Sequence, residues 1–145
     1  MTLVFQDTEG EITELLNRSV KQIICIDGIA HKNSFTNILL VWLKLEQEKC
    51  WYRIFFDAGL CFCSAYHSSE FAESYTEDID NSDDCPVYQI DVQFSLQGLI
   101  ISSASVYPIN TSYGIEFKIM FDNGDYLIMQ GTNFDSDIIL SITKA

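Results

Sequence analysis

The stretch GIEFKIMFDNGDYLIMQG, residues 114–131, indicates the fold of this chain more clearly than any other. Its first half alternates apolar residues with Glu116 and Lys118, which is the pattern of a strand with one buried face. Asn123 and Gly124 then form the dipeptide that most strongly favours a tight β-hairpin turn. The second half is again rich in apolar residues and supplies the return strand. The stretch therefore predicts an antiparallel hairpin.

Runs of the same kind lie on both sides of this hairpin. Turns of a few residues separate the runs 37–47, 50–56 and 60–66, and sequential strands joined in this way form an antiparallel meander. Two further strands are predicted at residues 21–30 and 99–110. The chain then closes with a short predicted strand within 134–145.

The run 87–98 is also predicted as one strand, because apolar and polar residues alternate along it. One predicted face holds Tyr88, Ile90, Val92, Phe94 and Leu96, and the other holds Gln89, Asp91, Gln93 and Ser95.

Residues 7–20 form the single segment that we predict as a helix. Thr8 and Glu11 match the capping-box pattern that starts many helices. Ile12, Leu15, Leu16 and Val20 follow with helical spacing and form an apolar stripe, which we expect to pack on a sheet. The predicted fold class is therefore mostly β (α+β). We expect a curved antiparallel sheet, or two packed antiparallel sheets, with one N-terminal helix, in a single domain spanning residues 1–145.

Composition and charge restrict the classes of function. Hydrophobic residues make up 48% of the 145 residues, which is typical of a folded globular protein. The net charge of −13 argues against binding nucleic acid or an anionic membrane surface, because both need lysine and arginine. The sequence MTLVFQDTEG lacks the features of a signal peptide, and no apolar stretch is long enough to span a bilayer. We expect a basic protein as the partner.

The acidic residues concentrate in SSEFAESYTEDIDNSDD, residues 68–84, which contains no basic residue. Between Arg53 and Lys118 there are ten acidic residues and no lysine or arginine. Such a block is typical either of a solvated loop or of a surface that meets a positive partner. We predict that the acidic residues contact the partner electrostatically: Glu70, Glu73, Glu77, Asp78, Asp80, Asp83 and Asp84. Phe71 and Tyr75 lie between them and are the predicted apolar anchors.

The five cysteines do not form a disulfide framework. Their number is odd, and Cys61 and Cys63 lie on one face of the same predicted strand, where bridging is geometrically poor. We infer a reducing compartment and a cytosolic protein. Side chains that can bind zinc occur at Cys61, Cys63, His67 and Cys85, but their spacing differs from that of compact zinc modules. We expect no metal and no other cofactor.

Signals for catalysis are weak. The chain has two histidines, His31 and His67, and His67 follows the predicted strand that contains Cys63. These two residues make a Cys/His hydrolase one alternative. Nucleotide-binding and metalloprotease motifs are missing from the sequence. DIDNSDD, residues 78–84, has Asp78, Asp80 and Ser82 at the alternate positions of a calcium loop but lacks its central glycine and terminal glutamate. We therefore do not expect an enzyme.

A small, very acidic, single-domain chain without a catalytic signature resembles a bacterial immunity protein. The DIDNSDD segment, the aromatic residues beside it and the unpaired cysteines carry this resemblance. In length and character the whole chain is similar to the immunity proteins of contact-dependent growth inhibition (polymorphic toxin) systems. The resemblance implies a cytoplasmic protein that binds a cognate nuclease toxin domain, with an RNase favoured, and neutralises it.

Physical chemistry supports this role independently. A nuclease presents a positive surface to phosphates, and a patch of carboxylates could occupy that surface in place of the RNA. Opposite potentials also speed the encounter of two proteins. We expect the protein to cover the RNA-binding or active-site surface of the toxin. The alternative from another class is a β-barrel that binds a small molecule or lipid, which requires an apolar cavity.

Overall fold

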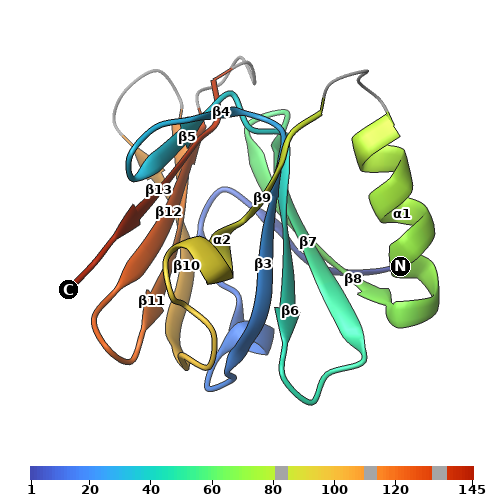
Figure 1. The fold of residues 1–145 in the computed structure, drawn as a ribbon, viewed down its shortest axis with the longest axis horizontal. Coiled ribbons are helices and arrows are strands. Elements are labelled where there is room, and N and C mark those ends of the chain that lie inside the picture. The colour runs from blue at the N-terminus through green and yellow to red at the C-terminus, as the bar shows by residue number, and fades with distance from the viewer. Residues whose placement is uncertain (81–84, 110–113, 132–136) are drawn as a thin grey trace.

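The computed structural model describes residues 1–80, 85–109, 114–131 and 137–145, and the backbone alone at Asp80. Two antiparallel sheets pack face to face, with a helix on the outer side of one of them (Figure 1). Among the described residues, strands account for 57% and only one helix has seven or more residues. The predicted fold class, mostly β with antiparallel sheets, is confirmed.

The first sheet has six strands, and its centre is the predicted meander. Arg53, for example, lies opposite both Trp42 and Ser64 on the two neighbouring strands. In spatial order the strands are β1 (Thr2–Asp7), β8 (Leu60–His67), β7 (Cys50–Asp57), β6 (Leu40–Leu45), β3 (Val20–Ile26) and β9 (Val87–Gln89).

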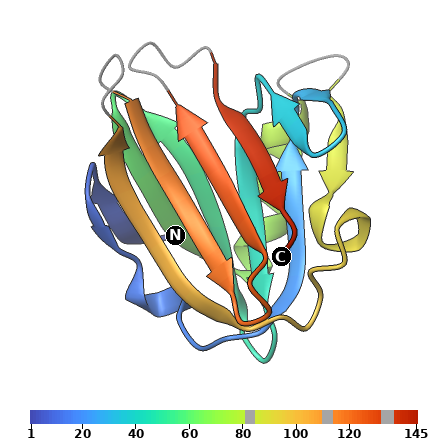
Figure 2. The same ribbon diagram turned by 90° about the vertical axis from the view of Figure 1, so that its left-hand side faces the viewer.

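The second sheet has seven strands and contains the predicted hairpin (Figure 2). Gly124 adopts a φ of +91°, which a glycine tolerates and most residues do not, and it turns the chain back on itself. In spatial order the strands are β2 (Gly10–Glu11), β10 (Ile101–Ile109), β11 (Gly114–Phe121), β12 (Tyr126–Gly131), β13 (Ile139–Thr143), β5 (Ser34–Thr36) and β4 (Ile29–Ala30).

The main hydrophobic core fills the space between the two sheets. Phe35, Phe117 and Ile54 are completely buried there, and each such side chain stabilises the fold by about 1.5–3 kcal/mol. A second cluster lies on the other face of the six-stranded sheet and includes Trp42 and Trp51. This sheet is therefore buried on its inner face and partly covered on its outer face, in contrast to a simple sandwich.

The predicted helix at residues 7–20 is wrong. These residues form the end of β1, then β2, and then η1, a single 3₁₀ turn at Thr13–Leu15. Gly10 has a φ of +147°, which is incompatible with a helix, and the N–H of Ile12 bonds to the carbonyl of Ala104 at 2.8 Å. The predicted apolar stripe is nevertheless largely buried, because turns and short strands place the same side chains in the core.

The predicted strand at 87–98 is correct only at its start. It ends at Gln89 and is followed by α2 (Ile90–Gln93). Asp91 is fully buried, where its carboxylate accepts hydrogen bonds from the N–H of Ile23 and the side chain of Gln97. Val92, which shares the apolar face of the predicted strand, is 63% exposed. A long-range contact of a polar residue thus overrides the alternating pattern.

Asp125 closes the hairpin turn with a second buried carboxylate. It accepts hydrogen bonds from Nζ of Lys144 at 2.6 Å and from the N–H of Ala145 at 2.8 Å. Its side chain is almost completely buried. The bond from Lys144, then that from Ala145, holds the pKa of the Asp125 carboxyl below its usual value.

We predict that Asp125→Asn lowers the free energy of unfolding by about 1 kcal/mol at neutral pH, because a charge-assisted bond is lost. The depressed pKa means that this contribution is present above the ordinary pKa of aspartate and disappears as the pH falls through the lower folded-state pKa. Urea unfolding of both proteins from about pH 7 to about pH 2 measures the difference. A difference that does not shrink in acid would contradict the assignment.

Candidate functional site

The acidic run forms a helix, α1 (Ser68–Asp80), which the sequence analysis did not predict. It lies along the outer face of the six-stranded sheet, beside β7 and β8 (Figure 1). Phe71, Tyr75 and Ile79 repeat at intervals of four residues and join the second hydrophobic cluster. The alternative of a solvated loop is therefore wrong for residues 68–80.

Hydrogen bonds fix the first turn of α1, through the carboxylate of Glu70 and through a bond from Ser68 to a neighbouring loop. Glu70 accepts the backbone N–H of His67 at 3.0 Å and the N-terminal ammonium of Met1 at 2.6 Å. The hydroxyl of Ser68 donates to the carbonyl of Lys49 at 2.6 Å. The bond from the N-terminal ammonium is the main reason that the pKa of Glu70 is lowered. Glu70 therefore stabilises the start of the helix, where negative charge is favourable.

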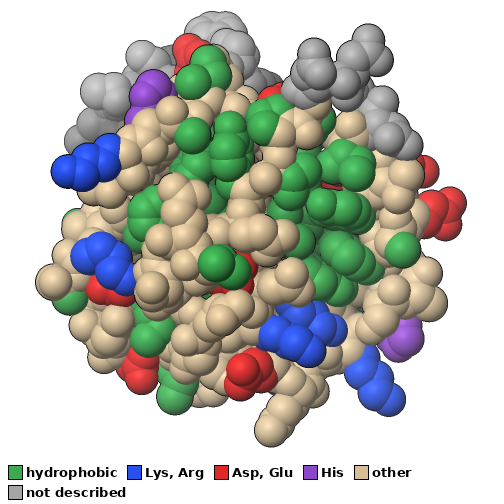
Figure 3. All heavy atoms as spheres, viewed as in Figure 1, with side chains coloured by type: hydrophobic (Ala, Val, Ile, Leu, Met, Phe, Trp, Pro, Cys, Tyr) green, Lys and Arg blue, Asp and Glu red, His purple; other side chains and the backbone are tan. Residues whose placement is uncertain are grey.

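Aromatic stacking attaches the inner side of α1 to the sheet. The ring of Phe71 stacks on Trp51 with centroids 4.0 Å apart and planes 7° apart, and it meets Trp42 edge-on at 5.0 Å. Tyr75 packs against Phe71 at 5.3 Å. Figure 3 shows the hydrophobic side chains gathered between β9 and α1. Phe71 and Tyr75, predicted as anchors for a partner, thus already bind the helix to its own sheet. Their contact with a partner stays a prediction.

Asp78 points inward and connects α1 to two strands. Its carboxylate accepts hydrogen bonds from Nε1 of Trp42 at 2.8 Å and from Nη2 and Nε of Arg53 at 2.8 and 3.2 Å. Only 6% of Asp78 is exposed. The prediction that Asp78 contacts the partner is corrected, because both of its oxygens are used inside the protein.

Glu73 and Glu77 are the predicted site residues that the structure places outward. Both are exposed, and neither has an ion pair or side-chain hydrogen bond within the described residues. They lie one helical turn apart, on the side of α1 that faces solvent. The last turn of α1 contains no basic residue, although the negative end of the helix dipole favours one there. Asp80 ends the helix; its side chain, and Asp83 and Asp84, lie outside the described residues.

Exposed acids outnumber exposed bases by two to one in the described part of the chain. The exposed acids are Asp7, Glu9, Glu11, Glu14, Glu46, Asp57, Glu73, Glu77, Asp122 and Asp137. The exposed bases are Arg18, Lys21, Lys32, Lys49 and Lys144. The surface is therefore suited to a positively charged partner.

A second group of exposed acids lies near the N-terminus and was not predicted from the sequence. Asp7, Glu9, Glu11 and Glu14 precede the first basic residue of the chain, Arg18. The wrong helix prediction concealed them, because it emphasised the apolar stripe of the same segment. Their spacing of two residues from Asp7 to Glu11 was the signal, since it indicates extended chain.

The candidate zinc ligands lie on different faces of the six-stranded sheet. Cys61 and Cys63 are completely buried in the core between the sheets, whereas Cys85 packs against the cluster under α1. His67 is exposed at the end of β8, where its ring contacts Ser69. The described residues contain no group of three or more metal-binding side chains that could hold an ion.

Burial also separates the Cys/His pair of the hydrolase alternative. Cys63 faces the core and its thiol has a raised pKa because it is desolvated, so the thiolate nucleophile is disfavoured. Burial likewise raises the pKa of Cys25 and of Cys61 to about 12 each. His67 is four strand residues from Cys63, about 13 Å at the rise of a β-strand, which is beyond hydrogen-bond reach.

We predict that Cys25, Cys61 and Cys63 do not react with a thiol reagent in the native protein at mildly alkaline pH. All three are buried with raised pKa values, whereas Cys50 and Cys85 are partly exposed. Labelling followed by peptide mass spectrometry, with and without denaturant, identifies the modified residues. Rapid native labelling of Cys63 would contradict the prediction and restore the hydrolase alternative.

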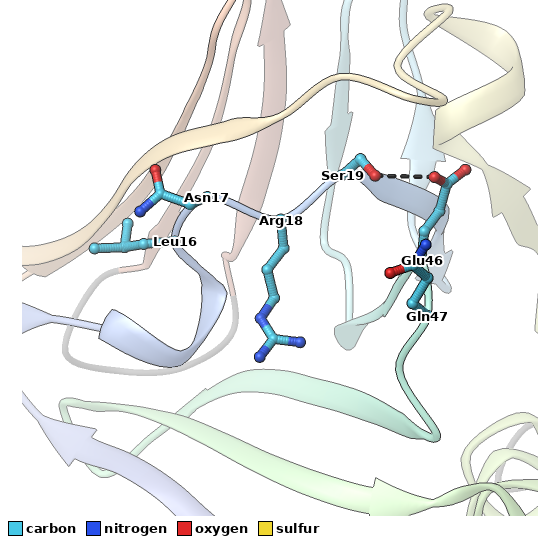
Figure 4. Close-up of a pocket in the computed structure, with 6 residues that line it drawn as sticks. All are labelled: Leu16, Asn17, Arg18, Ser19, Glu46 and Gln47. Atoms are coloured by element: carbon cyan, nitrogen blue, oxygen red, sulfur yellow. Dashed lines mark hydrogen bonds between the residues drawn. The ribbon is translucent and has the colours of Figure 1, made fainter.

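A cavity of about 450 Å³ opens beside the turn between β6 and β7. Its lining comes from residues 16–19 and from Glu46 and Gln47 (Figure 4). The hydroxyl of Ser19 donates to Glu46 at 2.9 Å, and Arg18 forms an ion pair with Glu48. This lining is polar, whereas a lipid-binding barrel needs an apolar cavity. The cavity therefore does not favour the small-ligand alternative.

No protein-family model, curated protein or solved structure matches this chain. Within the described residues, no helix combines the length and apolar character needed to cross a bilayer.

Proposed function

We propose that this protein is an immunity protein that binds and neutralises a basic nuclease toxin domain in the cytoplasm, without catalysing a reaction. As expected from the sequence resemblance, an RNase is the favoured toxin. The excess of exposed carboxylates over exposed bases favours a cationic partner. The buried thiols and the polar cavity make the enzyme and small-ligand alternatives less suitable.

The outward position of Glu73 and Glu77 on α1 is the observation that carries the proposal. Stacking of Phe71 and the ion pair of Asp78 fix the inner side of the helix, so the two free carboxylates are held in place. Glu77 lies at the helix end where negative charge is unfavourable by about 0.3–1 kcal/mol. A cationic side chain of the partner would convert this cost into attraction.

The inhibitory mechanism follows from the same charges. A ribonuclease needs a positive surface to hold the RNA backbone. Carboxylates on a rigid helix attract that surface during diffusion and then cover it, so the RNA is excluded. Rapid encounter matters for an inhibitor because each free toxin molecule cleaves RNA until it is bound.

The proposed function is tested in cells by pairing the protein with the toxic domain encoded by its neighbouring gene. We expect a large secreted protein with a toxic C-terminal domain to be encoded immediately upstream. Cells producing that domain should survive when this protein is co-expressed and die when it is replaced by an unrelated acidic protein. Absence of protection, with both proteins produced and folded, would refute the proposal.

We predict that the affinity for the toxin domain falls steeply with salt. Between about 50 mM and about 500 mM salt the dissociation constant should rise at least about tenfold, mainly through slower association. Kinetic binding measurements separate the association rate from the dissociation rate. A dissociation constant that does not change with salt would contradict electrostatic attraction as the main driving force.

A further inference from the structure

Two stacked phenylalanines lie on the outer face of the six-stranded sheet, next to the area under α1. Phe62 lies opposite Phe55 on β7 and opposite Gln6 on β1. The rings of Phe55 and Phe62 stack with centroids 5.0 Å apart and planes 6° apart, and both side chains are only half-buried. Large aromatic rings in such a position are typical of interfaces.

An exposed leucine extends this apolar surface to the edge of the sheet. Leu3 lies opposite Ser64, which lies opposite Arg53, so these three residues share a face with the stacked rings. Leu3 is 50% exposed. It belongs to β1, which is the last strand of the sheet on that side.

The charges around this surface are negative. Asp57 lies two residues beyond Phe55 on the same strand face and is exposed. Glu77 lies two helical turns after Glu70, whose carboxylate bonds the N-terminal ammonium beside β1, so both acids lie on the β1 side of α1. Lys49 lies at the N-terminal end of α1, where its carbonyl accepts a hydrogen bond from the hydroxyl of Ser68. The length of this 13-residue helix, about 20 Å, separates Lys49 from the other end of α1. Two cations lie nearer this surface, but each is paired: Arg53 with Asp78 and the N-terminal ammonium of Met1 with Glu70. Asp57 and Glu77 have no ion pair within the described residues.

The apolar patch on the other side of α1 differs in charge. It includes Ile79 and Val87, and Lys44 lies near it, 5.9 Å from the ring of Trp51. The ammonium of Lys44 donates to the carbonyl of Glu48 and has no carboxylate partner within the described residues, in contrast to Arg53. A cationic segment would be repelled there, so the charge pattern favours the side of Phe55 and Phe62.

We propose that one surface of this protein docks a basic segment of another protein, in which an apolar side chain lies beside lysine or arginine. We call this surface the β1-side face, and it consists of Leu3, Gln6, Phe55, Asp57, Phe62 and Glu77. The apolar side chain packs on Leu3 and the stacked rings, and the basic side chains pair with Asp57 and Glu77. This inference rests on the proposed function, because it names the surface that the cationic partner covers.

The test uses a short synthetic peptide of alternating lysine and leucine as the probe, titrated into the full-length protein. Amide and methyl NMR shifts locate the site, and the same titration gives the dissociation constant. Two control peptides replace leucine by serine or lysine by glutamate. We expect shifts centred on the β1-side face with the first peptide and at least about tenfold weaker binding with both controls.

Variants then assign the binding to individual side chains. Leu3→Lys should weaken peptide binding about tenfold, while Val92→Lys, which adds the same charge at another exposed apolar residue, should have little effect. Asp57→Asn with Glu77→Gln should weaken binding similarly, and Glu14→Gln should not. Leu3 and Val92 are both exposed, so neither replacement prevents folding. Shifts confined to residues 7–14, or equal effects of Leu3→Lys and Val92→Lys, would overturn the proposal.

The toxin assay separates this inference from the proposed function. If the protein protects cells but Leu3→Lys protects equally well, the β1-side face is wrong and the proposed function stands. If the peptide binds at the β1-side face but the protein fails to protect, the docking surface stands and the proposed function is wrong.

Discussion

Arg53→Ala is expected to destabilise the protein by about 3 kcal/mol, because it leaves the buried carboxylate of Asp78 without its cation. The pair has two bonds, from Nε and Nη2 of Arg53, and the side chain of Asp78 is only 7% exposed. Trp42 would remain as a donor but supplies no charge. The guanidinium of Arg53 also lies over the ring of Phe55, so this cation–π contact is lost as well.

A double variant that removes both charges separates the ion pair from the other contacts. Arg53→Met combined with Asp78→Leu should be closer to the wild type than Arg53→Ala alone, since no charge is then left buried. Urea unfolding gives the free energies, and fluorescence of Trp42 and Trp51 reports whether α1 stays docked. As a control, Arg18→Ala removes a more exposed ion pair with Glu48 and should cost less than about 1 kcal/mol. Equal costs for Arg53→Ala and Arg18→Ala would contradict the buried ion pair.

Glu73→Lys combined with Glu77→Lys is expected to weaken binding of the toxin domain about 100-fold, because attraction at two positions becomes repulsion. The same change should leave stability unchanged or raise it by up to about 1 kcal/mol, since lysine near the end of α1 complements the helix dipole. Affinity and stability would therefore change in opposite directions. Loss of binding through unfolding is thereby distinguished from loss of an interface.

The matched control for this pair changes charge at another exposed acid. Glu14→Lys lies in η1 and should reduce affinity only through the smaller net charge, by less than about tenfold. Calorimetric titration measures the affinities, and thermal unfolding measures the stabilities. If Glu14→Lys weakens binding as strongly as the α1 variant, the interface lies nearer the N-terminal acids than α1.

The strands could largely be predicted from the sequence because their side chains fill the cores. Apolar runs predicted β3, β6, β7 and β8, and alternation with a turn predicted β11 and β12. Burial on both faces of β6 explains why LVWLKL is a nearly continuous apolar run. The residue pattern and the packing agree in these strands, so the local sequence predicts their positions.

The helices were misassigned because local signals conflicted with distant contacts. A capping-box pattern suggested a helix at 7–20, but Gly10 and the bond from Ile12 to Ala104 extend the chain instead. In α1 the many acids concealed the spacing of Phe71, Tyr75 and Ile79. The residues that hold α1 against the sheet lie outside the segment, since Trp42 is 36 residues and Arg53 is 25 residues from Asp78.

The candidate site could be predicted only in part for the same reason. Composition indicated a negative surface, and the structure leaves Glu73 and Glu77 free on it. Charge alone did not reveal that Asp78 is an internal ion-pair partner or that Glu70 stabilises the start of the helix. Asp57 and Leu3 join the surface through strand pairing, which a single sequence does not specify.

Hydrogen–deuterium exchange of the protein, alone and bound to the toxin domain, tests the central claim most directly. The claim is that a cationic protein docks on the outward side of α1 and the neighbouring β1-side face. We predict slower exchange on binding in residues 68–79 and in β1, with little change in β12 and β13 of the other sheet. Slower exchange confined to the seven-stranded sheet, with α1 unchanged, would contradict the account.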